Sequence, residues 1–322
     1  MKTISIIVPC YNEEKSIGIL YEKILHMFHS ELSNYEFELI FVDDYSKDNT
    51  RNIIRQLCEK DKRVKAVFNI ANFGFSRNIF SAFCQPMNGD AVFMLFGDLQ
   101  DPPELLPEFI KKWEDGAKVV LGRKVKSDEN IFMRLMRNGY YFIVDRLSDR
   151  KQIEHFNGYG LYDKMFVDIM KQIEDPQPYL KTIVSEYAPD YAEVDYEHRK
   201  SVRGRSNFNF YKNYDFAMEG ITSSTKKLMR TATFSGVILG IISAIYGIYV
   251  LVRKILFWST YPLGVASLSV GIFLLGAMQL FFIGILGEYV LSINTRTMKK
   301  PRVIVEERIN FDDPADERDM SE

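Results

Sequence analysis

Residues 96–104 contain the side chains best suited to chemistry in this chain. They follow an apolar run, 91–95, which predicts a buried strand, and a pair of prolines then ends the extended segment. Asp98 and Gln100 stand two residues apart, so their side chains can point the same way and hold one hard cation through oxygen atoms. A cation with so few protein ligands keeps positions open for the diphosphate of a nucleotide. We therefore expect Mg²⁺ or Mn²⁺ at Asp98 and Gln100.

Two earlier clusters carry residue types that bind nucleotides. Tyr11 can stack on a base, and Glu13 can accept hydrogen bonds from base or ribose groups. The paired carboxylates Asp43 and Asp44 can accept hydrogen bonds in the same way, as acidic residues do at strand ends in nucleotide-binding folds. Plain strand-to-helix turns explain the same patterns, with helix caps at Asn12, Ser46 or Asp48.

Basic residues gather in two further places. Arg123 and Lys124 follow a predicted strand at 118–121, and a second group lies around Gly204, whose lack of a side chain permits close backbone approach. The members of that second group are Arg199, Lys200, Arg203 and Arg205. Guanidinium groups suit phosphate, so we expect both groups to bind phosphates, although a solvated basic loop is the alternative.

The elements that position these clusters alternate along the first 125 residues. Apolar, β-branched runs predict strands at 4–8, 37–42, 64–69, 91–95 and 118–121, and helical patterns fall at 14–30, 48–60 and 74–86. This alternation predicts an α/β fold with a mostly parallel sheet covered on both faces. Four polar clusters, at 9–14, 43–48, 72–74 and 98–104, follow predicted strands, which places them at the carboxyl edge, where ligands bind in such sheets.

Two long segments near the C-terminus are different in kind. Residues 232–252 and 255–287 contain no charged side chain, whereas a membrane-spanning helix needs about 20 apolar residues. The short connection at 253–263 predicts a two-helix transmembrane hairpin. Basic residues before the first segment and after the second outnumber Arg253 and Lys254 in the connection, so we expect both chain ends in the cytoplasm.

Overall composition excludes several classes of protein. The net charge of −2 gives no sign of a nucleic-acid partner, and three scattered cysteines argue against a disulfide framework and a zinc site. Mixed aromatic and basic residues at 129–148 and 211–230 fit amphipathic helices on a membrane surface, or ordinary surface helices. The hairpin surface permits a homo-oligomer without requiring one.

The ordered motifs resemble the polyprenyl-phosphate branch of glycosyltransferase family 2, the relatives of dolichol-phosphate mannose synthase. The matching segments are 9–13, 42–50, 72–74, 98–104, 204–206, 284–289 and 300–302. The resemblance implies a GT-A fold, a divalent metal ion and inversion at the anomeric carbon. One sugar would move from a UDP- or GDP-linked donor to an undecaprenyl or dolichyl phosphate.

The resemblance also implies roles for individual residues. The nucleotide-sugar would be held by Pro9, Tyr11, Glu13, Asp43, Asp44 and Asp98, and the metal by Asp98 and Gln100. The acceptor phosphate would be bound by Arg123, Arg199, Arg203 and Arg205. We expect catalysis to depend on Asp98, Arg123 and Arg203.

Three departures from the family pattern bear on mechanism. Relatives often have an acidic residue where this chain has Phe96, and an Asp and an Arg where it has Gly158 and Gly160. Ser201 and Asn207 replace basic residues that flank the glycine of the basic loop in many relatives. A phosphate acceptor has a second pKa of about 6 and is already ionised near neutral pH, so it needs little or no general base. The missing Asp at 158 therefore does not argue against this reaction.

The expected organisation is a GT-A domain at 1–210, a juxtamembrane helix at 211–230, two transmembrane helices at 231–295 and a cytoplasmic tail at 296–322. The protein would be an integral membrane protein of a bacterial cytoplasmic membrane. Two alternatives stay open. One is transfer to a glycan or lipid hydroxyl, which the absent base disfavours. The other is an inactive, membrane-anchored nucleotide-sugar-binding scaffold, which Phe96, Gly158 and Gly160 motivate.

Overall fold

The computed structural model describes residues 1–126, 153, 156–176, 178–199, 227–256, 265–298 and 300–311. The helix predicted at 129–148 lies outside the described residues, as does nearly all of the helix predicted at 211–230. Lys200, Arg203 and Arg205 of the basic loop also lie outside them.

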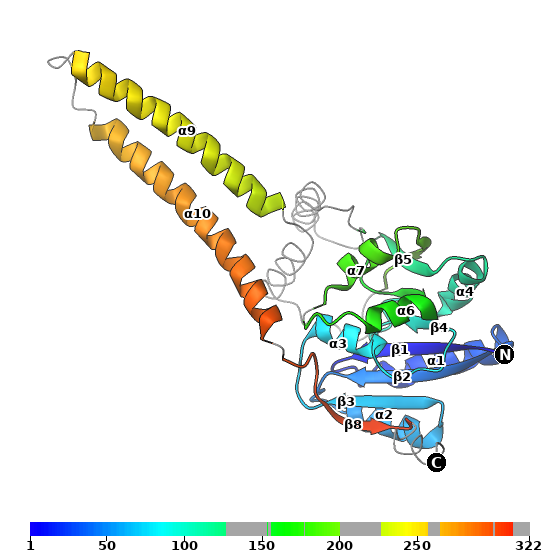
Figure 1. The fold of residues 1–322 in the computed structure, drawn as a ribbon. Helices are drawn as coiled ribbons and strands as arrows, with labels where there is room; N and C mark the ends of the chain where they lie inside the picture. The colour runs from blue at the N-terminus through cyan, green and yellow to red at the C-terminus, as the bar shows by residue number, and fades with distance from the viewer. Residues whose placement is uncertain are drawn as a thin grey trace, which may run out of the picture.

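A mixed, mostly parallel sheet forms the centre of the folded domain (Figure 1). Its strands are β1 (Lys2–Cys10), β2 (Tyr35–Asp43), β3 (Val64–Asn69), β4 (Ala91–Met94), β5 (Val119–Lys126), β6 (Gly160–Asp163), β7 (Ala192–Glu197) and β8 (Val305–Ile309). Their order across the sheet is β7-β5-β6-β4-β1-β2-β3-β8. Strand β1 runs parallel to β2 and β4, β2 to β3, and β5 to β7. Strands β6 and β8 run antiparallel to their neighbours.

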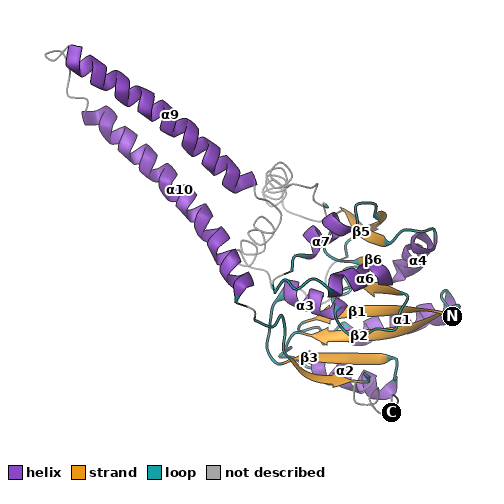
Figure 2. Cartoon of the chain, in the orientation of Figure 1, coloured by secondary structure: helices purple, strands orange, loops and turns teal. Residues whose placement is uncertain are grey.

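Helices cover both faces of the sheet, as Figure 2 shows. They are α1 (Ile17–Ser30), α2 (Thr50–Lys60), α3 (Phe75–Phe83), α4 (Leu106–Glu114), α6 (Lys164–Lys171) and α7 (Leu180–Tyr187), with a short 3₁₀ turn η1 at Pro103–Leu105. Alternating side chains of β1 enter opposite cores: Ile6 packs with α1 and α4, whereas Ile7 packs with α3. The central strands are apolar on both faces because both faces are covered.

The first four predicted strands and the three predicted helices are confirmed, with small shifts at their ends. The fifth strand extends beyond its predicted end at 121 and includes Arg123 and Lys124. Strands β6, β7 and β8 were not predicted. The last of these is the most consequential, because β8 lies within the predicted tail yet pairs with β3 at the edge of the sheet. It covers a row of backbone groups that would otherwise be exposed.

Two long helices extend away from the sheet side by side (Figure 1): α9 (Lys227–Leu256) and α10 (Val265–Thr297). Their helical segments differ from the prediction. Arg253 and Lys254 belong to the end of α9, and α10 begins ten residues later than the second apolar run. The reason is that long basic side chains are good helix formers, so a charged pair does not end a helix.

Large apolar side chains on these helices face outward. Phe234, Ile245 and Tyr246 of α9 are more than 60% exposed, and Leu280 of α10 is 71% exposed. Among the described residues, one segment, Leu275–Thr297, meets the length and hydropathy expected of a membrane-crossing helix. Contact of these apolar side chains with water is unfavourable.

Candidate active site

The predicted nucleotide- and metal-binding residues lie at or just after the carboxyl ends of β1, β2 and β4, whereas Arg123 lies in β5 and Arg199 follows β7. From β1 the chain adds β2 and then β3 on one side, and it then returns to place β4 on the other side of β1. The strand order therefore reverses between β1 and β4, which makes this position a topological switch point. Loops on either side of such a switch point diverge and leave a crevice, which is where open α/β sheets bind ligands. The loops after β1 and β2 lie on one side of this point, and residues 96–104 lie on the other.

The loops after β1 and β2 are joined by hydrogen bonds. The backbone N–H of Asn12 donates to Ser46 Oγ at 2.8 Å, and the Lys47 N–H donates to Asn12 Oδ1 at 2.7 Å. The Glu13 N–H donates to Thr50 Oγ1 at 2.8 Å. Asn12 therefore connects the two loops, and the cap position of α1 is occupied by Ser16.

Asp43 lies at the end of β2 and is completely buried. Its carboxylate accepts hydrogen bonds from the N–H and the hydroxyl of Ser46, and from Arg51 Nε at 2.8 Å. Arg51 comes from the first turn of α2 and is also largely buried, so the pair is an internal ion pair. Asp43 therefore shapes the loop after β2.

Asp44 performs a similar task for the loop after β3. Its carboxylate accepts from Asn69 Nδ2 at 3.1 Å and from the backbone N–H groups of Phe73 and Gly74, both at 2.9 Å. Burial raises the pKa of Asp44, and these donors oppose that shift by favouring the ionised form. The carboxylate predicted to contact a nucleotide thus orders the segment 69–74.

The turn after β4 brings Asp98 and Gln100 together. Asp98 Oδ1 accepts the backbone N–H of Gln100 at 3.1 Å, and Leu99 between them has a φ of 60°, which is uncommon for a branched side chain. Gln100 also pairs with Arg199: its backbone carbonyl accepts the Arg199 N–H at 3.0 Å, and its Nε2 donates to the Arg199 carbonyl at 3.2 Å. The turn is therefore tied to the start of the basic loop.

Asp101 lies beneath this turn, 1% exposed. Tyr196 Oη donates to its Oδ1 at 2.7 Å, and Asn157 Nδ2 donates to its Oδ2 at 3.0 Å. Burial raises the pKa of Asp101 to about 7, with the negative charge of Asp98 adding to the shift. Asp101 joins the turn after β4 to β7 and to the segment before β6, and it faces inward.

A side chain would be strained at Gly158 and would clash with a neighbouring strand at Gly160. Gly158 has a φ of +116°, and a Cβ there would lie 3.1 Å from Met94 Cε. A Cβ on Gly160 would lie 2.5 Å from the backbone oxygen of Val120 on the neighbouring strand. A residue other than glycine is therefore strained at position 158, where the atoms it would meet belong to side chains, whereas at position 160 the backbone would have to move.

The described cations of the predicted phosphate site are exposed and paired with acids. Arg123 contacts Asp195 through Nε at 2.7 Å and Glu193 through Nη1 at 2.7 Å, and Arg199 contacts Glu104 at 3.2 Å. Arg123 and its partners lie on adjacent strands, β5 and β7. A phosphate that bound these guanidinium groups would have to compete with the carboxylates.

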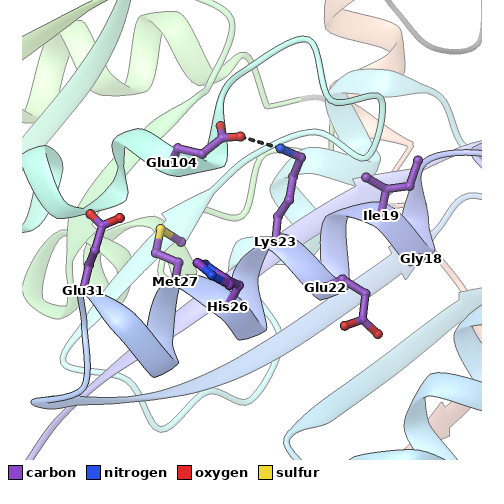
Figure 3. A pocket seen from close by; sticks show the side chains of 8 residues that line it. All are labelled: Gly18, Ile19, Glu22, Lys23, His26, Met27, Glu31 and Glu104. Carbon is purple, nitrogen blue, oxygen red and sulfur yellow. Dashed lines mark hydrogen bonds and ion pairs between the residues drawn. The ribbon is translucent and has the colours of Figure 1, made fainter.

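A shallow cavity of about 540 Å³ lies over α1, and its lining includes Glu104, the partner of Arg199 (Figure 3). Lys23 on α1 reaches across it and forms an ion pair with Glu104 at 2.6 Å. None of the predicted site residues lines it. We therefore assign no part of the candidate site to this cavity.

Comparison with known proteins identifies the family. The model of glycosyl transferase family 2 matches residues 5–168, which include the described clusters from Pro9 to Gly160. The chain is 34% identical to a bactoprenol glucosyl transferase of Shigella phage SfX, over 95% of this chain and 99% of that protein. It is 33% identical to a prophage bactoprenol glucosyl transferase homolog of Escherichia coli K12, over 94% of this chain and 98% of that protein.

The chain belongs to glycosyl transferase family 2. The predicted family, its polyprenyl-phosphate branch and the α/β GT-A fold class are confirmed, and the protein is a glycosyltransferase. A solved structure of glucosyl-3-phosphoglycerate synthase from Mycobacterium tuberculosis, in complex with Mn²⁺, UDP-glucose and phosphoglyceric acid, is 16% identical. It covers 69% of this chain and 78% of its own, with a TM-score of 0.48.

The donor set of Asp98 and Gln100 fits a hard divalent cation. Both side chains are half-buried at the carboxyl end of β4, and both offer oxygen atoms. The Gln100 amide nitrogen is directed to the Arg199 carbonyl, so the amide orientation is defined. Among the described residues, no group of three or more His, Cys, Asp or Glu side chains surrounds one point. A cation here would therefore depend on ligands from the substrate as well as from the protein.

Sequence reasoning missed several residues that order this site. Arg51 and Asn69 support the carboxylates after β2, and Asn157 and Tyr196 support Asp101. Asn69, Asn157 and Tyr196 each act on a carboxylate at least 25 residues away in sequence, which no local motif encodes. Arg51 alone had a local signal, because it stands eight residues after Asp43 on the first turn of a predicted helix.

Proposed function

We propose that this glycosyltransferase moves one sugar from a UDP- or GDP-linked donor to a polyprenyl phosphate, with inversion, at the cytoplasmic face of a membrane. The observation that carries the proposal is the 34% identity to a bactoprenol glucosyl transferase over nearly the whole of both chains. Similarity of that extent includes the long C-terminal helices as well as the folded domain.

The donor would lie over the carboxyl ends of β1 and β2. Pro9 and Tyr11 come from the loop after β1, and Glu13 lies where that loop meets the loop after β2. Asp43 and Asp44 are engaged internally, so their contribution is to hold the shape of the nucleotide-binding loops. Because the loops are already cross-linked, binding would order few additional groups.

Asp98 and Gln100 would hold Mg²⁺ or Mn²⁺ together with the donor diphosphate. A divalent ion in this position neutralises the charge that develops on the leaving nucleotide. Asp98 keeps the turn after β4 closed through its bond to the Gln100 N–H. Gln100 in turn fixes the start of the basic loop through its two bonds to Arg199.

The acceptor phosphate would bind the cations of β5 and the basic loop: Arg123, Arg199, Arg203 and Arg205. An ionised phosphate attacks without transferring a proton, so the protein must supply charge compensation and alignment. Gly158 carries no side chain that can act as a base, which suits such an acceptor. A hydroxyl acceptor would need a base.

The helices α9 and α10 would anchor the enzyme beside its lipid substrate. Their outward apolar side chains need a hydrocarbon environment, and helices of 30 and 33 residues are about 45–50 Å long, which exceeds the core of a bilayer. With both chain ends cytoplasmic, the sheet would lie on the side where nucleotide-sugars occur. The hairpin surface permits a homo-oligomer.

The test is a transfer assay with purified full-length protein in detergent or nanodiscs. Undecaprenyl phosphate is offered with a panel of UDP- and GDP-sugars, with Mg²⁺ or Mn²⁺, and products are identified by mass. One polyprenyl-phosphate sugar is expected. Product formed only on added glycans or lipid hydroxyls would replace this proposal with the hydroxyl-transfer alternative. Nucleotide binding without transfer across the panel would support the inactive scaffold instead.

A further inference from the structure

Strand β8 connects the chain beyond the long apolar helices to the loops of the donor side. The connection passes through Arg51, which makes three polar contacts with separate segments. Its Nε donates to Asp43 at 2.8 Å, its Nη2 donates to the Asn69 carbonyl at 2.5 Å, and its Nη1 donates to Glu306 at 2.9 Å. The Arg51 side chain is only 16% exposed, so these contacts fix its position.

The contacts continue from Arg51 into both nucleotide-side loops. Asp43 holds Ser46, and Ser46 Oγ accepts the backbone N–H of Asn12. Tyr45 has a φ of 65°, which is uncommon for so large a side chain, whereas asparagine tolerates the φ of 57° at Asn12. Arg51 thus supports two connected loops, one of which contains a strained residue, and Glu306 holds the outer end of Arg51.

A bulge explains how Glu306 reaches Arg51. In a regular strand, Glu306 and its neighbour Glu307 would point to opposite faces of the sheet. Here the register shifts between Phe68 and Asn69, so that Phe68 pairs with Glu307 and Asn69 with Val305, which leaves Glu306 as the extra residue. Both glutamates consequently reach the same helix, where Glu306 meets Arg51 and Glu307 meets Arg55 one turn later.

The segment between α10 and β8 is fastened to the folded domain as well. Arg302 donates to the backbone carbonyls of Asp175 and Ile173, and its guanidinium lies 4.9 Å from the centre of the Phe80 ring. The Ile70 N–H donates to the Ile304 carbonyl at 3.0 Å. The residues that follow α10 are therefore part of the domain that carries the donor loops.

We infer that β8 is a working part of the donor site, in which Glu306 positions Arg51 and Arg51 positions Asp43 and the loops beneath the nucleotide. This inference rests on the proposed function, because it places the nucleoside diphosphate over those loops. Glu306 and Arg51 are positioning residues: they act through Asp43 and the loop after β2.

The chain provides a matched control for this inference. Glu306 and Glu307 are adjacent, their side chains are 46% and 40% exposed, and each pairs with an arginine of α2. Arg51 contacts the donor-side carboxylate Asp43, whereas the contacts of Arg55 are with Glu307 and the Phe68 ring. Glu306→Gln and Glu307→Gln therefore remove equivalent ion pairs but differ in their connection to the donor loops.

Full-length wild type, Glu306→Gln and Glu307→Gln are compared for binding of UDP and of GDP with Mn²⁺ by calorimetry, and for sugar transfer. Glu306→Gln is expected to weaken nucleotide binding and raise the donor KM about three- to tenfold, which corresponds to roughly 0.6–1.4 kcal/mol. The kcat and the lipid KM should change less than twofold, and Glu307→Gln should resemble wild type. Equal shifts in the two variants, or none in either, would overturn the inference.

A second measurement separates this inference from the proposed function. Hydrogen exchange of residues 43–50 is measured without substrate in the same three proteins. Faster exchange confined to Glu306→Gln supports the inference even if wild type transfers no sugar to polyprenyl phosphate. Unchanged exchange in Glu306→Gln, or equal acceleration in both variants, contradicts it even if transfer proceeds as proposed.

Discussion

The proposed donor and acceptor sides, which lie on either side of the switch point between β1 and β4, are built in opposite ways. On the donor side, the acids Asp43 and Asp44 are buried and hold neighbouring loops through hydrogen bonds. On the acceptor side, Arg123 and Arg199 are exposed and pair with surface acids. The proposed donor side is therefore held by internal hydrogen bonds, whereas the cations of the proposed acceptor side make exposed contacts that a phosphate could replace.

The energetics of ion pairs account for this difference. Removing one member of a buried pair such as Arg51 and Asp43 leaves an uncompensated charge, which typically costs about 3–5 kcal/mol. Pairs between exposed side chains contribute little because water and salt screen them. An anionic lipid headgroup can thus displace the acids of the acceptor side, while the donor side keeps its shape. Changes on the two sides should differ in size and even in sign.

The largest effect is expected at the turn that joins the two sides. Asp98→Ala should lower kcat for sugar transfer by at least about 10³-fold, equivalent to roughly 4 kcal/mol of transition-state stabilisation, because it removes the acidic metal ligand. The folded domain should keep its stability, since Asp98 is half-buried and has no part in the apolar core. Steady-state transfer and thermal unfolding measure the two quantities.

Asp98→Asn is the control that keeps the size and polarity of the side chain. It should lose nearly as much activity while preserving an acceptor oxygen for the Gln100 N–H. Turnover close to wild type in purified Asp98→Ala would remove the assigned role of this residue.

The next effect concerns Asp101, which anchors the acceptor side. Its pKa is raised by burial from 3.8 to about 7, so the folded state retains a proton that the unfolded state releases above about pH 4. Stability should therefore fall as pH rises from about 4 to 7 and level off above 7, by an amount on the order of 4 kcal/mol at most. Asp101→Asn, which does not titrate, should flatten this dependence.

The measurement is thermal unfolding of detergent-solubilised protein across this pH range in the presence of EDTA. Removal of divalent ions keeps the charge near Asp101 the same in every sample. If the stability of Asp101→Asn varied with pH as much as that of wild type, groups other than Asp101 would account for the pH dependence.

Much of the fold was predictable from local patterns, because the first four strands and three helices have strong apolar periodicity. Strands β6 and β8 were missed for a physical reason: the four residues of β6 include a glycine, and β8 has three consecutive charged residues between Val305 and Ile309, in a segment that resembles a tail. Their strand character comes from pairing with β4, β5 and β3. Pairing between distant segments is not encoded locally.

The sequence predicted which residues belong to the candidate site better than it predicted which contacts each residue makes. The motif positions place Asp43 and Asp44 near a nucleotide, but only the structure gives their internal partners, Arg51 and Asn69. Gly160 was read as a missing arginine, whereas the Val120 carbonyl leaves no space for a side chain there. Residue types and their order along the chain locate the site, whereas packing between distant segments decides which side chains hold its loops in place.

Gly158→Asp tests whether transfer to polyprenyl phosphate gains anything from a carboxylate at position 158. The substitution should destabilise the protein by about 1–3 kcal/mol, since an L residue at φ +116° is strained and the new Cβ crowds Met94. It should not raise transfer to polyprenyl phosphate, because that acceptor needs no base. Unfolding and transfer rates are compared with those of Gly158→Ala, which carries the same strain without the carboxylate. An Asp variant several-fold more active than the Ala variant would contradict this account.

Arg203 lies outside the described residues and remains assigned to the acceptor by resemblance. Arg203→Gln should raise the KM for the lipid phosphate about tenfold, equivalent to roughly 1.4 kcal/mol, through loss of a charge-assisted hydrogen bond. Hydrolysis of the donor in the absence of lipid should change much less. Equal losses in both reactions would place Arg203 on the donor side or in the fold.

The smallest expected effect has the opposite sign. Asp195 is exposed and holds Arg123 through two hydrogen bonds, which lower the pKa of its carboxyl group. Asp195→Asn should remove one of the two acidic partners of Arg123, which keeps its contact with Glu193. The lipid-phosphate KM should then fall by about two- to threefold, in keeping with the small value of exposed ion pairs. The gain should shrink as ionic strength rises, because salt weakens the original pair.

The matched substitution on the donor side is Asp43→Asn, which also removes a carboxylate from an arginine. It should weaken donor use and stability, because Arg51 and Ser46 lose the buried acid that orders them. Improved lipid use in Asp195→Asn together with poorer donor use in Asp43→Asn is the result that the two-sided architecture requires. If both variants lost activity toward the same substrate, Arg123 would depend on Asp195 for its placement, and the acceptor side would be as preorganised as the donor side.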